Sequence, residues 1–134
     1  MESFSRVIQL TADGSHTLYS PSLDENYHSR HGAIQEAVHV FINAGYTYHS
    51  AAELSILEIG FGTGLNALLT FNETIKSPRK VNYTGIEAFP LNEEEINTLN
   101  YAQFVTAEAA AKYLTIMTSN WEDPIQISDL FRVC

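Results

Sequence analysis

The chain has 134 residues, of which 45% are hydrophobic, and sixteen Asp and Glu residues against seven Lys and Arg give it a formal net charge of −9. This length suits one domain with its own core, and no apolar run approaches the roughly 18 residues of a membrane-spanning helix. The acidic balance opposes broad attraction to nucleic acids. The first residues lack the basic start and apolar stretch of a signal peptide, so a cytoplasmic protein is expected.

The segment 7–19 carries apolar residues on both sides of Asp13-Gly14. An Asp-Gly pair between such runs favours a two-residue turn, so we predict a β-hairpin within an N-terminal region of residues 1–22. Ser20-Pro21 ends the pattern, because proline cannot continue a hydrogen-bonded strand.

A helical period follows, with apolar residues such as Ala33, Ala37 and Phe41 on one face. It predicts a helix from about His28 to Ala44 that stops at Gly45.

Two histidines in this segment, His28 and His31, are three residues apart and raise the question of a metal site. Glu25 and Glu36 are near them in sequence, but there is no H-E-x-x-H motif and no cysteine support. Cys134 is the single cysteine and lies at the last position. We therefore predict no metal site and interpret these histidines as partly buried or surface residues.

The stretch 54–66 carries the strongest signal in the chain. A short apolar run is followed by Gly60, Gly62 and Gly64 at every second position. This order is typical of a buried strand, a tight loop and the start of a helix. Glycines let the backbone take positive φ and approach a ligand closely, and the first amides of the next helix point toward that ligand.

The residues around these glycines indicate which ligand the loop binds. A dinucleotide-binding loop follows G-x-G-x-x-G, whereas here the third glycine comes one residue early and Leu65 takes its place. Glu58 precedes the loop, and a carboxylate repels phosphate but favours a cationic ligand or one with ammonium and hydroxyl donors. S-adenosylmethionine is therefore favoured over NAD, and an NAD-binding half-domain is the disfavoured alternative.

A second acid, Glu87, ends the next predicted strand, residues 81–87, and comes 23 residues after Gly64. That spacing is close to the roughly 20 residues expected for an acid that binds ribose hydroxyls. A basic cluster of Lys76, Arg79 and Lys80 precedes this strand, and we interpret it as a solvated loop.

The remaining elements complete an α/β pattern. A helix follows the glycine loop and ends at Ser77-Pro78, and Asn92 with Glu95 predicts a capped helix start. Residues 107–114 are rich in helix formers, and residues 130–134 can form a third strand. This order predicts an α/β fold with a parallel sheet, a Rossmann-like half over residues 23–134.

Several blocks together resemble the tRNA 5-methylaminomethyl-2-thiouridine methyltransferases. They are residues 11–20 (TADGSHTLYS), 24–29 (DENYHS), Gly32-Ala33 with Glu36-Ala37, Val40-Phe41, 58–66 (EIGFGTGLN) and 87–91 (EAFPL). The resemblance covers nearly the whole chain, and its N-terminal blocks are more specific than the glycine loop.

This resemblance implies a Rossmann-like methyltransferase fold and methyl transfer from S-adenosylmethionine to the amine of 5-aminomethyl-uridine, or its 2-thio derivative, at the tRNA wobble position. By motif position the cofactor contacts are Glu58, Gly60, Gly62, Gly64, Asn66 and Glu87, while Tyr27, His28 and Gly32 form a block near the pocket. tRNA is the implied partner, and an FAD oxidoreductase is fused to such enzymes in many bacteria.

The family continues past residue 134 into a strand with an Asp-x-Phe-x-Pro motif near the reacting amine, so we expect a truncated fold and name no catalytic residue. The alternative is a non-catalytic S-adenosylmethionine-binding or assembly module. A parallel sheet cut after about three strands exposes an edge and an apolar face. We therefore expect a homo-oligomer, with the strand at 130–134 as the vulnerable edge.

Overall fold

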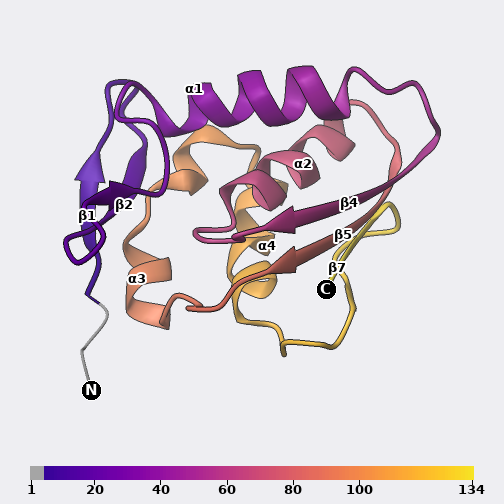
Figure 1. Cartoon of the computed structure of the whole chain (residues 1–134). Coiled ribbons are helices and arrows are strands. Elements are labelled where there is room, and N and C mark those ends of the chain that lie inside the picture. The colour runs from indigo at the N-terminus through magenta and orange to yellow at the C-terminus, as the bar shows by residue number, and fades with distance from the viewer. Residues whose placement is uncertain (1–4) are drawn as a thin grey trace.

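The computed structural model describes residues 5–134, so most of the N-terminal start from which the absence of a signal peptide was predicted lies outside this range. It contains two sheets and a set of helices (Figure 1). In chain order the elements are β1 (Val7–Leu10), β2 (His16–Ser20), β3 (Glu25–Asn26), α1 (Ala33–Ala37), η1 (Val38–Tyr46), β4 (Glu53–Ile59), α2 (Leu65–Lys76), β5 (Lys80–Ile86), α3 (Glu93–Thr98), η2 (Tyr101–Phe104), α4 (Ala107–Thr118), β6 (Ile125–Gln126) and β7 (Phe131–Val133). No helix in the described range is long and apolar enough to cross a membrane.

The N-terminal sheet contains the predicted hairpin, with β1 and β2 antiparallel and β3 added beside β2. The prediction of a two-residue turn at Asp13-Gly14 is wrong, because Leu10 pairs with His16 and a five-residue loop, 11–15, joins the strands. The carboxylate of Asp13 explains the longer loop. It accepts hydrogen bonds from the hydroxyl of Thr11 and from the backbone and side chain of Ser15, which favours a loop closed by side chains over a tight turn.

The long helix is shorter at its start than predicted: α1 begins at Ala33, not at His28. The backbone N–H of His28 instead donates to the hydroxyl of Thr17 in β2, which holds this stretch against the hairpin. From Val38 to Tyr46 the helix is a π-helix, so it runs past Gly45, which does not terminate it. The periodicity predicted an apolar face correctly, while π-type bonding has no sequence signal here.

The main sheet has the order β4-β5-β7-β6. β4 is parallel to β5 over seven residue pairs, from Glu53 with Lys80 to Ile59 with Ile86, and β5 is parallel to β7. This confirms the predicted parallel sheet. The register brings the ends of β4 and β5 to the same level, so the loops that follow them lie next to each other at one end of the sheet.

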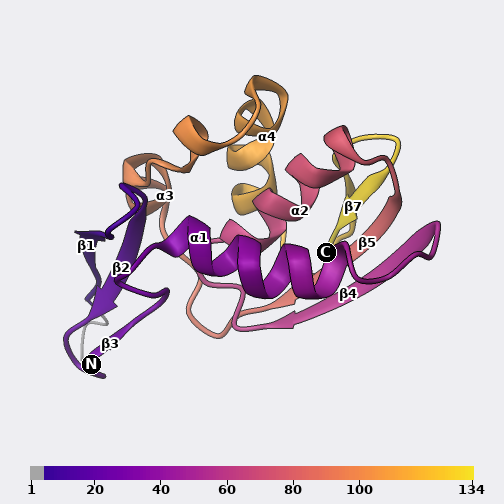
Figure 2. The same cartoon turned by 90° about the horizontal axis from the view of Figure 1, so that it is seen from above.

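The core lies between the main sheet and the helices. α1, η1, α2 and α4 lie on one side of this sheet, as the two views agree (Figures 1 and 2). Inward-facing residues of β5 and β7 are buried there, and Tyr83 and Phe131 stack with centroids 6.0 Å apart. Phe71 of α2 packs on Phe131 from the helical side, at 5.3 Å between centroids. Burial of this one face supplies the hydrophobic stabilisation of the sheet.

The opposite face of the sheet carries no helix among the described residues. Exposure alternates along β4, and its outward residues Leu57 and Ile59 are 63% and 73% exposed, next to Ile86 of β5 at 52%. Within residues 5–134 β4 pairs only with β5, so these residues leave its outer edge open. The prediction that residues 130–134 form the edge is wrong: β7 lies between β5 and the short antiparallel strand β6.

Candidate functional site

The loop between β4 and α2 is fixed by the end of β5. The backbone N–H groups of Gly60 and Phe61 both donate to the carbonyl oxygen of Ile86, at 2.8 and 3.1 Å. The ring of Phe61 lies against Gly85, where an added Cβ would fall 2.2 Å from it. The loop is therefore held at the carboxyl end of the two strands, the end where α/β proteins bind ligands.

Gly62 has a φ of 56° and lies against the ring of Tyr27. A Cβ at this position would come within 3.1 Å of Cδ2 of that ring. Both the backbone conformation and the contact require glycine. The close approach seen here is to the side chain of Tyr27. The predicted approach of a ligand to the backbone of Gly62 stays a prediction.

Gly64 has a φ of 70° and immediately precedes α2. A Cβ here would lie 2.2 Å from the sulfur of Met117 in α4 and 3.2 Å from Phe61. Its close approach is thus to the protein interior, and it is absent from the lining of the hollows described below. Gly64 shapes the loop by letting α4 pack under it.

Glu58 lies at the end of β4 with its side chain on the covered face of the sheet. The hydroxyl of Tyr83 donates to its Oε1 at 2.8 Å, and the amide of Asn66 in α2 donates to its Oε2. Burial raises the pKa of Glu58, as does the nearby Glu87, while the two hydrogen bonds oppose the rise. The carboxylate is therefore oriented by two side chains and half withdrawn from water, so a cationic group beside it would stabilise its charged form.

Glu87 follows β5 and reaches back to the glycine loop. Its Oε1 accepts the N–H of Gly62 at 2.7 Å, and its Oε2 accepts the N–H of Phe89 at 3.2 Å. Each carboxylate oxygen can accept a second hydrogen bond. Glu87 thus fixes the loop and keeps capacity for a hydroxyl donor.

Thr63, within the loop, is fully buried and joins three other elements. Its Oγ1 hydrogen-bonds with Nε2 of His28 at 2.9 Å and accepts from the hydroxyl of Tyr101 at 3.3 Å, and its carbonyl accepts the hydroxyl of Tyr113 at 2.6 Å. Burial lowers the pKa of His28 to about 4. The imidazole is therefore neutral near pH 7 and adds no positive charge to the site.

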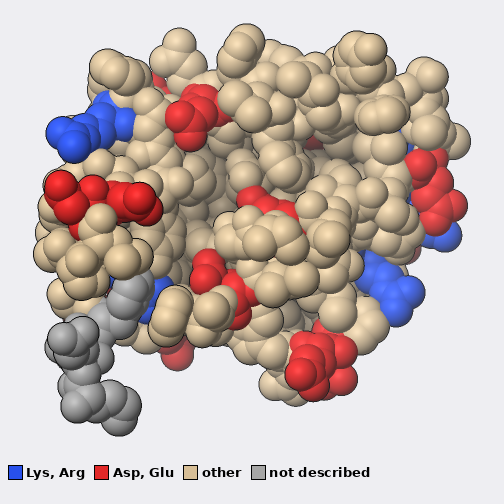
Figure 3. All heavy atoms as spheres, in the orientation of Figure 1, with Lys and Arg blue, Asp and Glu red and all other residues tan. Residues whose placement is uncertain are grey.

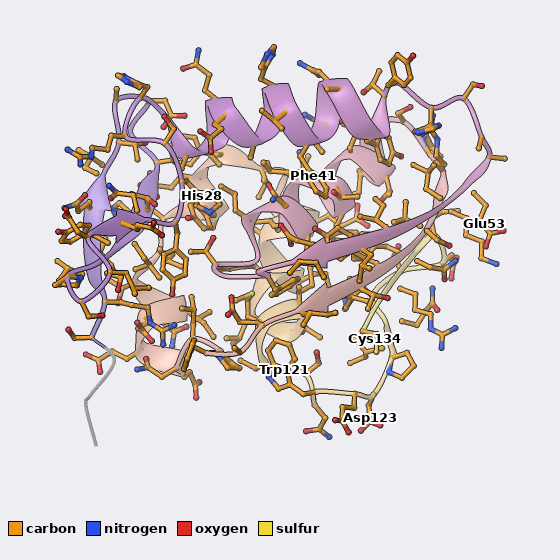
Figure 4. The ribbon with its side chains drawn as sticks, in the orientation of Figure 1. His28, Phe41, Glu53, Trp121, Asp123 and Cys134 are labelled. Carbon is orange, nitrogen blue, oxygen red and sulfur yellow. The ribbon has the colours of Figure 1, made fainter. Side chains whose placement is uncertain are left out.

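Two hollows meet over this loop. The first, of about 360 Å³, lies below the long helix and is lined by Tyr27, His28, Glu36, Ala37, Val40, Phe41, Glu58, Ile59, Gly60, Phe61, Gly62 and Asn66. The second, of about 400 Å³, lies toward the hairpin and is lined by Ser20, Leu23, Glu25, Asn26, Tyr27, Gly60, Gly62, Glu87 and Phe89. Figure 4 shows His28 and Phe41 on the sheet-facing side of the helix. The hollows share Tyr27, Gly60 and Gly62, and together they have the size of a small-molecule site.

Both hollows are acidic. Glu36 and Glu58 line the first and Glu25 and Glu87 line the second, while within the described part of the chain no Lys or Arg lines either. Figure 3 shows acidic side chains around the hollowed centre of this face, with basic side chains toward its margins. Such a lining attracts a cation and repels a polyphosphate.

The structure places five of the six predicted contact residues at these hollows: Glu58, Gly60, Gly62, Asn66 and Glu87. The sixth, Gly64, faces Met117 and Phe61 in the interior and lines neither hollow. Sequence reasoning gave Tyr27 and His28 only as members of a nearby block and did not assign a role to Thr63. The position of Thr63, a small polar residue between two loop glycines, is the sequence signal that could have indicated its role.

Three other polar residues from the sequence analysis, Arg79, Lys80 and His28, have structural partners. The guanidinium of Arg79 lies 4.6 Å from the ring centroid of Tyr46 and donates to its carbonyl, and Lys80 is 3.9 Å from Glu53. His28 is engaged by Thr63. Between residues 5 and 134 no three His, Cys, Asp or Glu side chains are arranged to hold a metal ion.

Comparison with known proteins gives partial matches to one group. No family model matches the chain. It is 38% identical over 96 residues to the tRNA 5-methylaminomethyl-2-thiouridine biosynthesis bifunctional protein MnmC of Leptospira interrogans, which covers 66% of this chain and 15% of that protein. It is 30% identical over 124 residues to the protein of the same name from Leptospira borgpetersenii, covering 87% of this chain and 18% of the relative.

A solved structure agrees with these matches. The crystal structure of MnmC2 from Aquifex aeolicus has a TM-score of 0.61 and 31% identity, and the match covers 69% of this chain and 32% of that one. The α/β class predicted from the sequence is confirmed by this likeness. The chain spans less than a fifth of the length of these two Leptospira relatives.

Proposed function

Since this chain is related to a part of the MnmC family and shares its methyltransferase-type α/β fold, we propose that it forms the S-adenosylmethionine-binding portion of a methyltransferase. The proposed reaction is N-methylation of 5-aminomethyl-uridine, or its 2-thio derivative, in the tRNA wobble position. S-adenosylmethionine would supply a methyl group activated on a sulfonium. tRNA is the proposed partner, a cytoplasmic location is proposed with it, and an FAD oxidoreductase is a proposed functional partner because the relatives are named bifunctional proteins.

The observation that carries this proposal is the pair of acidic hollows that meet over Gly60 and Gly62. A dinucleotide would place its pyrophosphate at this loop, where Glu58 and Glu87 oppose it. S-adenosylmethionine instead brings an ammonium, a sulfonium and two ribose hydroxyls, all of which a carboxylate favours. The donor set therefore fits this cofactor.

Each predicted contact then has a chemical role. Glu87 accepts hydrogen bonds from the ribose hydroxyls, Glu58 attracts the ammonium, and Asn66 orients Glu58. Gly60 and Gly62 let the ligand lie against the backbone. Gly64 acts indirectly through the loop that it shapes. No described residue is assigned as the base that would deprotonate the amine.

Titration calorimetry with S-adenosylmethionine, S-adenosylhomocysteine and NAD tests the proposal. We expect both adenosyl ligands to bind in competition with each other and NAD to bind far more weakly. Gly62→Val should abolish binding, while Gly45→Ala, at a position with open space around it, should leave it unchanged. Comparable affinity for NAD, or unchanged binding by the Gly62 variant, would remove the proposal.

A non-catalytic binding module is the second candidate. The net charge of −9 and the acidic lining of both hollows favour it, because they oppose a tRNA polyanion. Such a module should bind the same ligands as the proposed methyltransferase, but it would not transfer the methyl group to tRNA.

A further inference from the structure

Tyr27 lies where the two hollows meet. Its side chain lines both, and its Cδ2 and Cε2 atoms lie 3.1 and 3.5 Å from the position of a Cβ at Gly62. The Cδ2–Cε2 side of the ring therefore contacts the loop. We call this ring, which contacts the loop and lines both hollows, the partition.

This partition is fixed in place. The backbone N–H of Tyr27 donates to the carbonyl of Leu18 at 2.8 Å, and its hydroxyl accepts from the guanidinium of Arg6 at 3.2 Å. Arg6 also donates to the carbonyl of Phe89 at 2.7 Å and forms an ion pair with Glu95 at 2.8 Å. The ring is thus held by β2 on one side and by the segment after β5 on the other.

The proposed ligand must pass this partition, and the following inference rests on the proposed function. Glu87 faces the second hollow and Glu58 the first. If the ribose lies at Glu87 and the amino acid part at Glu58, the sulfur that joins these two parts lies where the hollows meet, beside the ring of Tyr27. In S-adenosylmethionine this sulfur is a cation, and in S-adenosylhomocysteine it is a neutral thioether.

We infer that Tyr27 is a specificity-determining residue whose ring recognises the sulfonium charge and so favours the methyl donor over its demethylated product. Aromatic faces attract cations through their quadrupole, and partial burial strengthens that attraction. The surrounding carboxylates act in the same direction. Tyr27 differs from the carboxylates because its ring lines both hollows and so lies next to the sulfur that joins the two parts of the ligand.

The test measures dissociation constants of S-adenosylmethionine and S-adenosylhomocysteine by calorimetry for the wild type, Tyr27→Phe and Tyr27→Leu. The preference for the sulfonium ligand should fall by roughly 2- to 30-fold in Tyr27→Leu and be retained in Tyr27→Phe, which keeps the ring. Tyr48→Leu is the matched control, because Tyr48 is 80% exposed and lines neither hollow.

The outcomes separate this inference from the function on which it rests. If Tyr27→Leu weakens the binding of both ligands equally, the ring contributes only contact area, and the inference is overturned while the binding function stands. Failure of the wild type to bind either ligand would overturn both. If Tyr27→Leu does not fold, the wild type decides: an analogue with an ammonium in place of the sulfonium should bind more tightly than S-adenosylhomocysteine, and equal affinity overturns the inference.

Discussion

Oδ2 of Asp13 accepts the backbone N–H of Gln35 at 2.9 Å, which connects the hairpin loop to the first turn of α1. Thr11 and Ser15 act with it, since their hydroxyls accept the N–H groups of Ala33 and Ile34 at 3.1 Å each. Three side chains from one loop therefore satisfy three free amides at the start of the helix that covers the first hollow.

Asp13→Ala should lower the free energy of unfolding by about 1–2 kcal/mol, because it removes a helix cap and the bonds that close the loop. Urea unfolding at pH 7 measures this change. Asp123→Ala is the control, because Asp123 is exposed and its side chain forms no hydrogen bond or ion pair within the described range. Equal destabilisation by the two variants would contradict the capping role.

The same carboxylate makes stability depend on acidity. Burial alone would raise the pKa of Asp13, but hydrogen bonds from Ser15, Gln35 and Thr11 outweigh it and hold the pKa below 3.8. Its contribution is therefore complete above pH 3.8 and is lost as the pH falls through the folded value. Asp13→Asn should remove this loss from unfolding curves recorded below pH 4.

The buried His28 makes the free energy of unfolding depend on pH in a higher range than Asp13 does. Because burial lowers its pKa to about 4 from 6.5, the unfolded chain binds a proton that the folded chain excludes. Stability should be highest above pH 6.5 and fall by about 3 kcal/mol as the pH drops to 4. In His28→Gln that part of the decline should be absent, whereas in His49→Gln, at an exposed position, it should persist.

The chain alone should bind the methyl donor without methylating tRNA. Its charge of −9 and acidic hollows give little attraction to a polyanion, and no described residue is assigned as the base. Incubation with undermodified tRNA and labelled S-adenosylmethionine measures transfer. Robust labelling would show that the described residues already hold a complete catalytic site.

Self-association should occur through the open edge of β4 and the apolar residues beside it. Leu57→Lys should shift the protein toward monomer in sedimentation experiments at micromolar concentration, because it places a charge on the exposed strand. Leu114→Lys, on α4 and 43% exposed, should have no such effect. A wild-type monomer at that concentration would contradict this expectation.

The sequence predicted the elements whose signals are local. The strand before the glycines, the helix after them and the capping pair Asn92 and Glu95 are all confirmed. The two-residue strands β3 and β6 are too short to carry a pattern. The two-residue turn predicted at Asp13-Gly14 is wrong because the Asp13 carboxylate closes a longer loop with Thr11 and Ser15 and also binds Gln35.

At the candidate site, the sequence pattern indicated the loop glycines, whose backbone conformation favours that residue type. Gly62 and Gly64 both have positive φ, but Gly62 meets Tyr27 beside the hollows and Gly64 meets Met117 in the interior. No spacing rule separates these two roles, because the partners come from distant parts of the chain. The same is true of Thr63, whose partners lie in three other segments.

The hairpin also has a consequence for the order of folding. Its backbone bonds to the side chains of Asn100 and Tyr101 span 84 and 85 residues, and the bond from Arg6 to the carbonyl of Phe89 spans 83. The hairpin is therefore synthesised well before Phe89, Asn100 and Tyr101, the residues on which it docks. Contacts of such long range form slowly, because loop closure precedes the stabilisation that they provide. The position of Tyr27 beside the glycine loop therefore depends on contacts of much longer range than the pairing of β4 with β5.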